Sequence, residues 1–529
     1  MGLVRQRVFS HYFGLSDAAD VFSAAFRIPN FLQNMFGEGV LSASFIPVYA
    51  ALLARDDEEE SGRVAGAIGA VLALVASALV LLGVLATPWL IDAITPGFGG
   101  AKRELAVRVV RILFPGAGLL VLSAWCLGIL NSHRRFLLSY TAPVVWNVAM
   151  IATLVIFGNR MGQFPLAETL AWGSVAGSAL QFGVQVPPVI RLARRLRPSL
   201  DLRSENVRAV IRNFVPVFVS RGVVQISAYV DALLASLLPA GAVAGLTSAQ
   251  LLYTFPVSLF GMSVSAAELP AMSSALGGER EVAEHLRRRL NQGLRRIAFF
   301  IIPTSVGFLA LGDVIAAALL EPGRFTHGDS LYIWGILAGS TVGLLATTLG
   351  RLYSSTYYAL RDTRTPLRYA IVRVALTTGL GYAMALPLPP AIGLDPRWGV
   401  AGLTISAGLA GWLEFILLRR TLNRRIGTTG LPLGFTARLW ASAAAAAAAG
   451  WGVKLAIGHR NPVLAAALIL TPYGLVYFGA SLLAGVEEAA ALAARVPGAA
   501  AALARVPGLR RAGRTAGSTP GSPRPGPGS

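Results

Sequence analysis

Charged side chains interrupt the apolar stretches of this chain, and several of them would suit recognition of an anion. A charge at the centre of a bilayer costs ~2.5–3.5 kcal/mol on insertion scales, so such a side chain normally faces a cavity or a partner. Guanidinium groups also match phosphate oxygens in bidentate geometry. The charges of this kind are Arg5, Asp20, Arg27, Glu38, Arg212, Arg221, Asp231, Glu268, Arg351 and Arg373.

Each of these charges has a simpler interpretation, as half of a structural ion pair or as a helix-end residue that snorkels to the interface. Snorkelling is the more natural interpretation for Arg212, Arg351 and Arg373, which lie near predicted helix ends. Arg221 and Asp231 are nearly three helical turns apart, so they share a rough face and cannot touch. A lumen with more arginine than acid would favour an anionic substrate.

The stretch 26–50, "FRIPNFLQNMFGEGVLSASFIPVYA", combines such charges with residues that break helices. Pro29 and Pro47 each delete a backbone donor, and the freed carbonyls can be satisfied only against protein or cavity water. Gly37 and Gly39 flank Glu38. We expect Pro29, Gly37, Gly39 and Pro47 to act as hinges.

Catalytic and metal-binding motifs are absent from the sequence. The five histidines are far apart, and no HExxH, CxxC, Walker A or nucleophile-elbow motif occurs. The single cysteine, Cys126, lies in an apolar run and is expected to be a small core residue. We therefore expect a non-enzyme without cofactor or metal, driven by a coupling ion, the membrane potential or the substrate's own gradient.

Composition indicates a polytopic helical membrane protein. The 529 residues are 54% hydrophobic and 14% charged, and apolar runs of about 20 residues recur from end to end. Thirteen candidate spans follow from these runs: 18–54, 63–95, 105–131, 136–158, 164–190, 207–238, 243–275, 294–320, 330–360, 366–388, 398–418, 434–457 and 462–484. The short apolar segment before them is expected to be the end of a truncated first helix; an interfacial helix is the alternative.

The net charge of +20 comes largely from arginines in alternate loops. This pattern follows the positive-inside rule and argues against nucleic-acid binding. We expect a multi-pass protein of the bacterial inner membrane, with these loops and the C-terminus in the cytoplasm. The Pro/Gly/Ser-rich end is expected to be disordered, and its arginines could rest on anionic lipid.

Two sequence similarities indicate an internal repeat. "NMFGEGVLSASFIP" at 34–47 resembles "SLFGMSVSAAELP" at 258–270, and "GILNSHRRF" at 128–136 resembles "YALRDTRTP" at 358–366. Six predicted helices separate the copies, which gives parallel repeats and two facing lobes. The predicted domains are an N-lobe at 1–190, a basic linker at 191–206, a C-lobe at 207–425, a helix pair at 426–485 and a low-complexity tail at 486–529.

The opening residues, "GLVRQRVFSHYFGLSDAADVFSAAFRIPNFLQNMFGEGVLSASFIPVYA", resemble the MurJ (MviN) lipid II flippases of the MOP transporter superfamily. Further similarity lies in "ILFPGAGLLVLSAWCLGILNSHRRFLLSYTAPVVWN", "QISAYVDALLASLLPAG" and "LYTFPVSLFGMSVSAAELPAMS". The resemblance implies fourteen helices in two six-helix lobes plus a C-terminal pair. It also implies that the chain moves undecaprenyl-pyrophosphate-linked peptidoglycan precursor to the outer leaflet by alternating access. We further expect a monomer whose partners are this lipid-linked substrate and the membrane lipids.

The resemblance also suggests which residues line the lumen. Arg5 matches the family's "GxxR", Asp20 the Asp before its "AF" run, Arg27 the basic residue before "PN", and Glu38 the Glu of "EG". Asp231 matches the polar position after "QIS". The expected lumen set is Arg5, Asp20, Arg27, Asn30, Glu38, Arg221 and Asp231.

The sequence departs from the family pattern at three positions. Gln33, Asn34 and Leu251 stand where family members usually or often carry Arg. Arg221 could partly restore this charge. The alternatives to a lipid II flippase are a paralogue for another polyprenyl-linked saccharide, a MATE-like antiporter, which would want an acidic lumen, and a non-transporting cell-wall scaffold. An integral-membrane glycosyltransferase would need acidic residues on a long loop, and none is present.

Overall fold

The computed structural model describes residues 1–36, 40–41, 44–193, 195–197, 199–200, 203–274, 278–321, 323–458 and 461–494. Among these residues the regular structure is entirely helical. The chain divides into two compact units. The first contains residues 1–248, 319–332 and 382–403, and the second contains 249–318, 333–381 and the described residues from 404 onward. The domain boundaries expected from the sequence stay a prediction.

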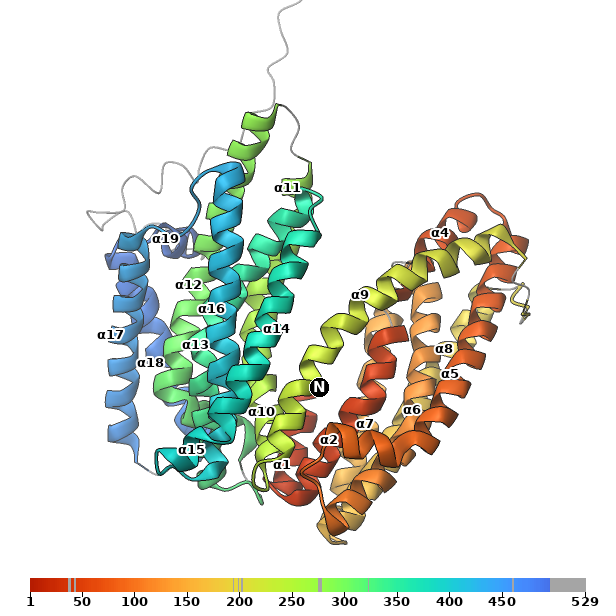
Figure 1. Ribbon diagram of the computed structural model, residues 1–529, viewed down its shortest axis with the longest axis horizontal. Helices are drawn as coiled ribbons and strands as arrows, with labels where there is room; N and C mark the ends of the chain where they lie inside the picture. Colours follow the sequence, from red (N-terminus) through yellow and green to blue (C-terminus); the bar gives the residue numbers. More distant parts are fainter. Residues whose placement is uncertain are drawn as a thin grey trace, which may run out of the picture. The chain divides into compact units, whose positions relative to one another are not determined.

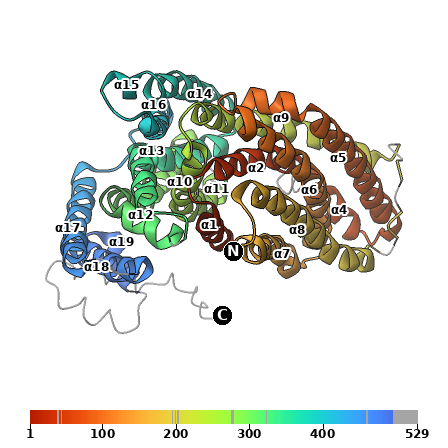
Figure 2. The same cartoon turned by 90° about the horizontal axis from the view of Figure 1, so that it is seen from below.

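The first unit is built mainly from the N-terminal helices. These are α1 (Gly2–Phe13), α2 (Asp17–Phe36), α4 (Ile46–Leu53), α5 (Glu58–Ile94), α6 (Gly100–Ser132), α7 (Phe136–Phe157), α8 (Gln163–Leu192) and α9 (Glu205–Ser236), with the start of α10 (Ala242–Pro256). Helix α6 packs against α2, α5 and α8, and α7 packs against α8 and α1 (Figures 1 and 2).

The second unit contains most of the remaining helices. After α10 come the π-helix η1 (Val257–Met262), α11 (Ser263–Ser273), α12 (Glu279–Leu320), α13 (His327–Ala359), α14 (Arg364–Ala385), α15 (Leu388–Ala391), the 3-10 helix η2 (Pro396–Trp398), α16 (Gly399–Ile426), α17 (Leu433–Ile457), α18 (Pro462–Leu483) and α19 (Glu487–Ala493). The short α15 and η2 fall in the first unit. Helices α17 and α18 pack together as a pair, as the sequence predicts for 426–485.

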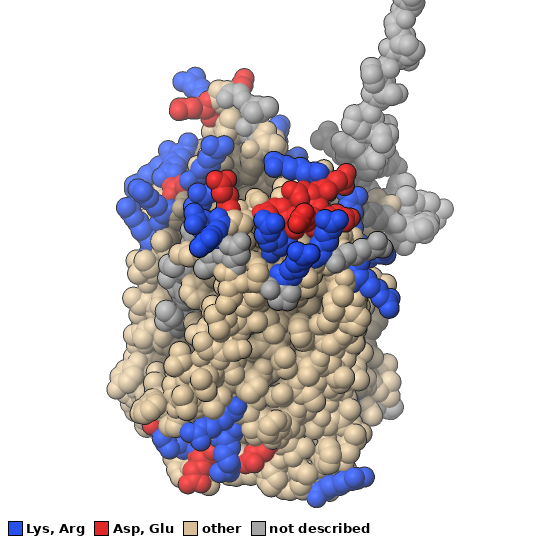
Figure 3. Space-filling model, turned by 90° about the vertical axis from the view of Figure 1, so that its right-hand side faces the viewer, with Lys and Arg blue, Asp and Glu red and all other residues tan. Residues whose placement is uncertain are grey.

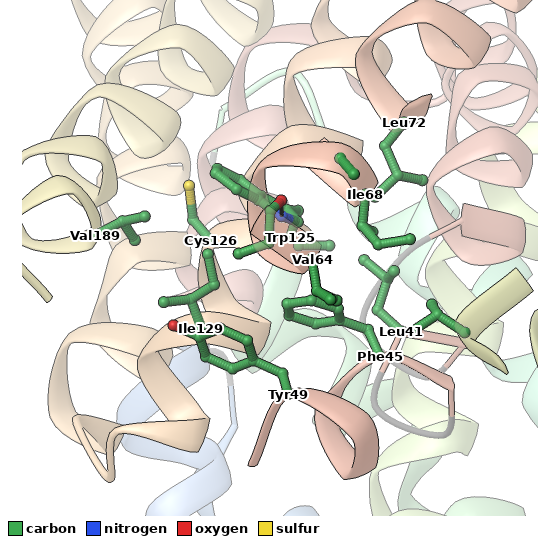
Figure 4. Close-up of a cluster of buried hydrophobic side chains, with 14 of the residues drawn as sticks. Leu41, Phe45, Tyr49, Val64, Ile68, Leu72, Trp125, Cys126, Ile129 and Val189 are labelled. Atoms are coloured by element: carbon green, nitrogen blue, oxygen red, sulfur yellow. Dashed lines mark hydrogen bonds between the residues drawn. The ribbon is translucent and has the colours of Figure 1, made fainter. Parts of the chain in front are cut away.

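A buried cluster in the first unit joins residues of α4, α5, α6, α8 and α9. Phe45 and Tyr49 pack with Val64 of α5 and Trp125 of α6, and the Trp125 Nε1 donates to the Ala65 carbonyl at 3.1 Å (Figure 4). The cluster also holds Leu41, Ile68, Leu72, Cys126, Ile129 and Val189. Cys126 is a buried free thiol, as expected.

Local sequence signals explain where α4 and α5 begin. Asp57 caps α5 by accepting a hydrogen bond from the Glu60 backbone N–H at 3.0 Å, and three glutamates occupy the first turn, where the helix dipole favours negative charge. Pro47 is in the first turn of α4, where its missing N–H costs nothing. Pro47 therefore starts a short helix here, and its role as a hinge stays a prediction.

The predicted spans agree with the helices along most of the chain, and four differ. The run 398–418 is too short, because α16 continues to Ile426. The run 18–54 is divided, because Phe45 lies in a turn directly before α4. The run 243–275 contains the π-helix η1 directly after Pro256. The run 294–320 starts too late, because α12 begins at Glu279. The first turns of this helix are rich in arginine, so hydropathy does not reveal them.

Eight helices among the described residues are long and apolar enough to cross a membrane. On the face shown in Figure 3, charged side chains gather near the two ends, and uncharged residues fill the band between them. This distribution fits a protein whose middle lies in hydrocarbon. The all-α membrane class predicted from composition is confirmed, and the pseudo-repeat between the halves stays a prediction.

Candidate functional site

Arg5 of α1 is held by aromatic rings in the first unit. Its guanidinium carbon lies 5.5 Å from the ring centroid of Phe26 and 5.0 Å from that of Trp146, and the two rings stack on each other with centroids 5.6 Å apart. Among the described residues, no carboxylate forms an ion pair with Arg5. The side chain is only half-buried. The ring faces stabilise the cation without neutralising it, so its charge remains available to an anion.

Arg27 of α2 lies where three helices of the first unit meet. Its Nη2 donates to Thr247 Oγ1 of α10 at 3.1 Å, and the Tyr229 hydroxyl of α9 donates to the Arg27 carbonyl at 2.8 Å. Arg27 is also within electrostatic range of Asp231 on α9. The structure thus brings together two residues of the expected lumen set, Arg27 and Asp231, and sequence reasoning missed Tyr229 and Thr247, whose types carry no distinctive signal.

Asp20 has a different environment. Its carboxylate accepts hydrogen bonds from the backbone N–H groups of Gly241 and Ala244 at 2.8 Å each, and it pairs with Lys102 Nζ at 2.9 Å. The side chain is 1% exposed. Asp20 therefore caps the start of α10 and links it to α6. Its predicted contact with substrate stays a prediction, and Lys102 was missed because it precedes its apolar run like an ordinary loop charge.

The other expected residues give less information. Asn30 is half-buried in α2, and the backbone of Arg221 is helical within α9. The side chains of Arg221 and Pro29 fall outside the described part of the structure. Glu38, Gly37 and Gly39 lie outside the described residues altogether. Where Arg was expected, Gln33 and Leu251 are half-buried, and Asn34 is exposed.

Two titratable groups outside the spans have perturbed acidities. Burial lowers the pKa of His133, which follows α6, and the nearby Arg135 lowers it further; the His133 Nε2 is 3.1 Å from the Tyr49 hydroxyl. The pKa of Asp362, in the turn before α14, is lowered, because hydrogen bonds from Thr365 and Arg425 outweigh the opposing effect of burial.

The arrangement favours binding over catalysis. No group of His, Cys, Asp or Glu that could hold a metal ion occurs among the described residues. The side chains that meet inside the first unit are cations, aromatic rings, hydroxyls and the carboxylates of Asp20 and Asp231. Such groups can bind an oxyanion through charge-assisted hydrogen bonds and a sugar through ring faces and hydroxyls.

Comparison with known proteins identifies close relatives in sequence. A family model described as "Lipid II flippase MurJ" matches residues 9–475. A lipid II flippase MurJ from Burkholderia cenocepacia is 30% identical over 431 residues, which cover 80% of this chain and 81% of that protein.

Solved structures show the same fold. A lipid II flippase MurJ in an inward closed conformation matches with a TM-score of 0.74 and 24% identity, over 91% of this chain and 95% of that chain. An inward-facing multidrug resistance MATE family transporter of the MOP superfamily matches with a TM-score of 0.65 and 19% identity, over 81% and 96% of the two chains. The predicted MOP-like architecture is thereby confirmed at the level of the fold.

Proposed function

Because this chain belongs to the lipid II flippase MurJ family, we propose that it moves lipid II, the undecaprenyl-pyrophosphate-linked peptidoglycan precursor, from the inner to the outer leaflet. The relative from Burkholderia cenocepacia is named for this activity. Alternating access, in which the substrate site opens to one leaflet at a time, is the mechanism that goes with this transporter fold. The biological role is cell-wall biogenesis, and no covalent bond of the substrate changes.

The observation that carries the proposal is the environment of Arg5. It is a cation within a hydrophobic protein, held over Phe26 and Trp146 and without an ion-paired carboxylate among the described residues. Such a charge is costly unless a ligand or water completes it. A pyrophosphate group supplies the missing negative charge and matches guanidinium geometry. Arg27 and Thr247 provide a second cation and a hydroxyl in the same unit.

The energy for transport comes from the membrane potential or a coupling ion. Export of an anionic headgroup from a negative-inside cell gains about 2.3 kcal/mol per charge per 100 mV. We place the protein in the inner membrane as a monomer without a cofactor, with its C-terminus in the cytoplasm. The arginines between α8 and α9 and in the last turns of α16 support this orientation.

A second candidate substrate is another polyprenyl-linked saccharide. The observation in its favour is the uncharged character of Gln33, Asn34 and Leu251, where the family pattern carries Arg. Fewer cations would suit a headgroup with fewer negative charges. Both candidates share the lipid carrier and the direction of transport, so only the headgroup distinguishes them.

Complementation tests the proposal directly. The chain is expressed in a strain depleted of its own lipid II flippase, and growth and cell shape are followed. Rescue by the wild type is expected, and Arg5→Gln is expected to lose it at equal membrane expression. Arg7→Gln is the matched control, since it removes a neighbouring positive charge from the same helix. Failure of the wild type to rescue, while a known lipid II flippase does, contradicts the lipid II assignment.

A further inference from the structure

The second unit holds a polar cluster of its own on α10, α13, α14 and α16, and all but α14 belong to the candidate membrane spans. Arg373 of α14 pairs with Glu414 of α16, with 3.3 Å between Nη1 and Oε2. Glu414 also interacts electrostatically with Arg351 of α13. Tyr253 of α10, hydrogen-bonded to Thr347, interacts electrostatically with both arginines. Four helices thus direct polar side chains to one place.

The Arg351 guanidinium lacks a close polar partner among the described residues. Among the described residues it forms no hydrogen bond or ion pair within the usual distances, and its side chain is exposed. It lies eight residues before the end of α13 at Ala359, which is about 12 Å along the helix axis. An exposed guanidinium on so apolar a helix keeps its hydrogen-bond donors available to water or a ligand.

The charges of the cluster do not balance. Arg351 and Arg373 contribute two positive charges, and Glu414 contributes one negative charge. The pair of Arg373 and Glu414 is also accessible, since the two side chains are 36% and 16% exposed. Because only Arg373 pairs with the single carboxylate, the two guanidinium groups retain hydrogen-bond donors for a second oxyanion. The Tyr253 hydroxyl adds a neutral group with remaining hydrogen-bonding capacity.

Close helix packing gives the cluster a fixed frame. Helices α13 and α16 touch through glycines, because a Cβ added to Gly343 would lie 2.4 Å from the Gly408 Cα. Trp412 Nε1 donates to the Val342 carbonyl at 2.6 Å, and Thr404 Oγ1 donates to that of Ile336 at 3.0 Å. The backbones that carry Arg351 and Glu414 are therefore held at a set distance. A preorganised frame of this kind is what a binding site requires.

The predicted repeat relates this cluster to the Arg5 environment. Tyr253 lies 227 residues after Phe26, and Arg373 lies 227 residues after Trp146. Phe26 and Trp146 are the two rings that contact the Arg5 guanidinium. This offset falls between those of the two sequence similarities, 224 for Phe36 and Phe260 and 230 for 128–136 and 358–366. The second unit thus has polar groups at the positions where the first unit has the rings that hold its cation.

We propose that Arg351, Arg373, Glu414 and Tyr253 form an oxyanion-binding site for the transported headgroup. The proposal rests on the proposed function and adds a second place where the headgroup is held. The ligand is a carboxylate or a phosphate oxygen, which come from the peptide and the pyrophosphate of the substrate respectively. The site also supplies positive charge in a chain that lacks it at Gln33, Asn34 and Leu251.

Binding of inorganic pyrophosphate tests the site without transport. The purified full-length protein is titrated in detergent by calorimetry. Arg351→Gln is expected to weaken binding about tenfold, the effect of losing one charge-assisted hydrogen bond. Arg288→Gln, which removes an exposed positive charge from α12, is the control and is expected to bind like the wild type. Equal affinity of Arg351→Gln and the wild type, at equal melting temperature, would overturn the proposal.

Two further variants keep the test informative. Arg351→Lys retains the charge, so it keeps the fold if Arg351→Gln does not, and it is expected to weaken binding about threefold by losing bidentate geometry. Glu414→Gln removes the competing carboxylate and is expected to tighten binding about threefold. Weaker binding by Glu414→Gln at an unchanged melting temperature would contradict the charge argument.

Transport in proteoliposomes identifies the source of the oxyanion. Flipping by Arg351→Gln is compared for lipid II and for an analogue without the peptide. A defect with lipid II alone assigns the site to a peptide carboxylate, and a defect with both substrates assigns it to the pyrophosphate. Normal flipping of both overturns the site's role in transport. If the wild type flips neither, the proposed function fails, and the pyrophosphate titration still decides whether the site exists.

Discussion

Asp20 offers a prediction that separates a structural role from a substrate-binding role. Its carboxylate accepts two backbone hydrogen bonds, from Gly241 and Ala244, and pairs with Lys102. A hydrogen bond to a charged group contributes ~1.5–3 kcal/mol, and breaking a buried ion pair by removing one partner costs ~3–5 kcal/mol. These effects overlap, because the same oxygens serve both. Asp20→Ala is therefore expected to lower the free energy of unfolding by about 3–5 kcal/mol.

Asp17 provides the matched control for this prediction. It also pairs with Lys102, at 2.8 Å, but its side chain is 48% exposed. Solvent screens such a pair, so Asp17→Ala is expected to cost no more than about 1 kcal/mol. Unfolding of both variants by SDS in mixed micelles gives the two free energies under the same conditions.

The outcome for Asp20 decides between two roles. If Asp20→Ala is as stable as Asp17→Ala, the contacts of the Asp20 carboxylate with Gly241, Ala244 and Lys102 do not stabilise the fold. Loss of flipping by Asp20→Asn at unchanged stability would then place the carboxylate with the substrate. The structure predicts instead that substitution of Asp20 destabilises the fold, and that any loss of flipping follows from this destabilisation.

Three further predictions concern the rest of the fold. Burial lowers the pKa of His133, so the unfolded chain binds the proton more tightly than the folded one. The contribution of His133 to the free energy of unfolding is therefore fully present above the ordinary pKa near 6.5 and is lost as the pH falls below it. Melting temperatures measured against pH are expected to fall less in His133→Gln than in the wild type. Trp451→Phe removes the donor to the Ala310 carbonyl, next to the break in α12, and is expected to cost ~1–3 kcal/mol in SDS unfolding. Gly66→Ala would place a Cβ against the Arg197 carbonyl oxygen, so faster proteolysis between α8 and α9 is expected, whereas unchanged cleavage would contradict this contact.

Much of the fold could be predicted because lipid imposes simple rules on sequence. Apolar length and alternating basic loops located the spans, and they located α7 and α18 within a few residues. The start of α12 at Glu279 and the π-helix after Pro256 escaped this reasoning. Hydropathy does not detect an arginine-rich helical segment such as the start of α12. Composition also does not show whether a helix is of the α or the π type.

The site was harder to predict than the fold. Charge within apolar runs singled out Arg27 and Asp231, which the structure brings within electrostatic range of each other, and their place in a lumen stays a prediction. The same criterion selected Asp20, whose partners are backbone N–H groups of a distant loop that no local pattern reveals. It also favoured snorkelling for Arg351, which lies near a predicted helix end, and the electrostatic interaction of Arg351 with Glu414 on α16 could not be foreseen from one helix alone.

Flipping of fluorescent lipid II by the reconstituted full-length protein tests the central claim most directly. Externally added reductant quenches the labelled lipid that has reached the outer leaflet. The wild type is expected to expose the inner pool, and Arg5→Gln is expected to lose at least about nine-tenths of this rate while Arg7→Gln retains it. Protection of the inner pool in wild-type vesicles, or equal rates for the wild type and Arg5→Gln, would contradict the account.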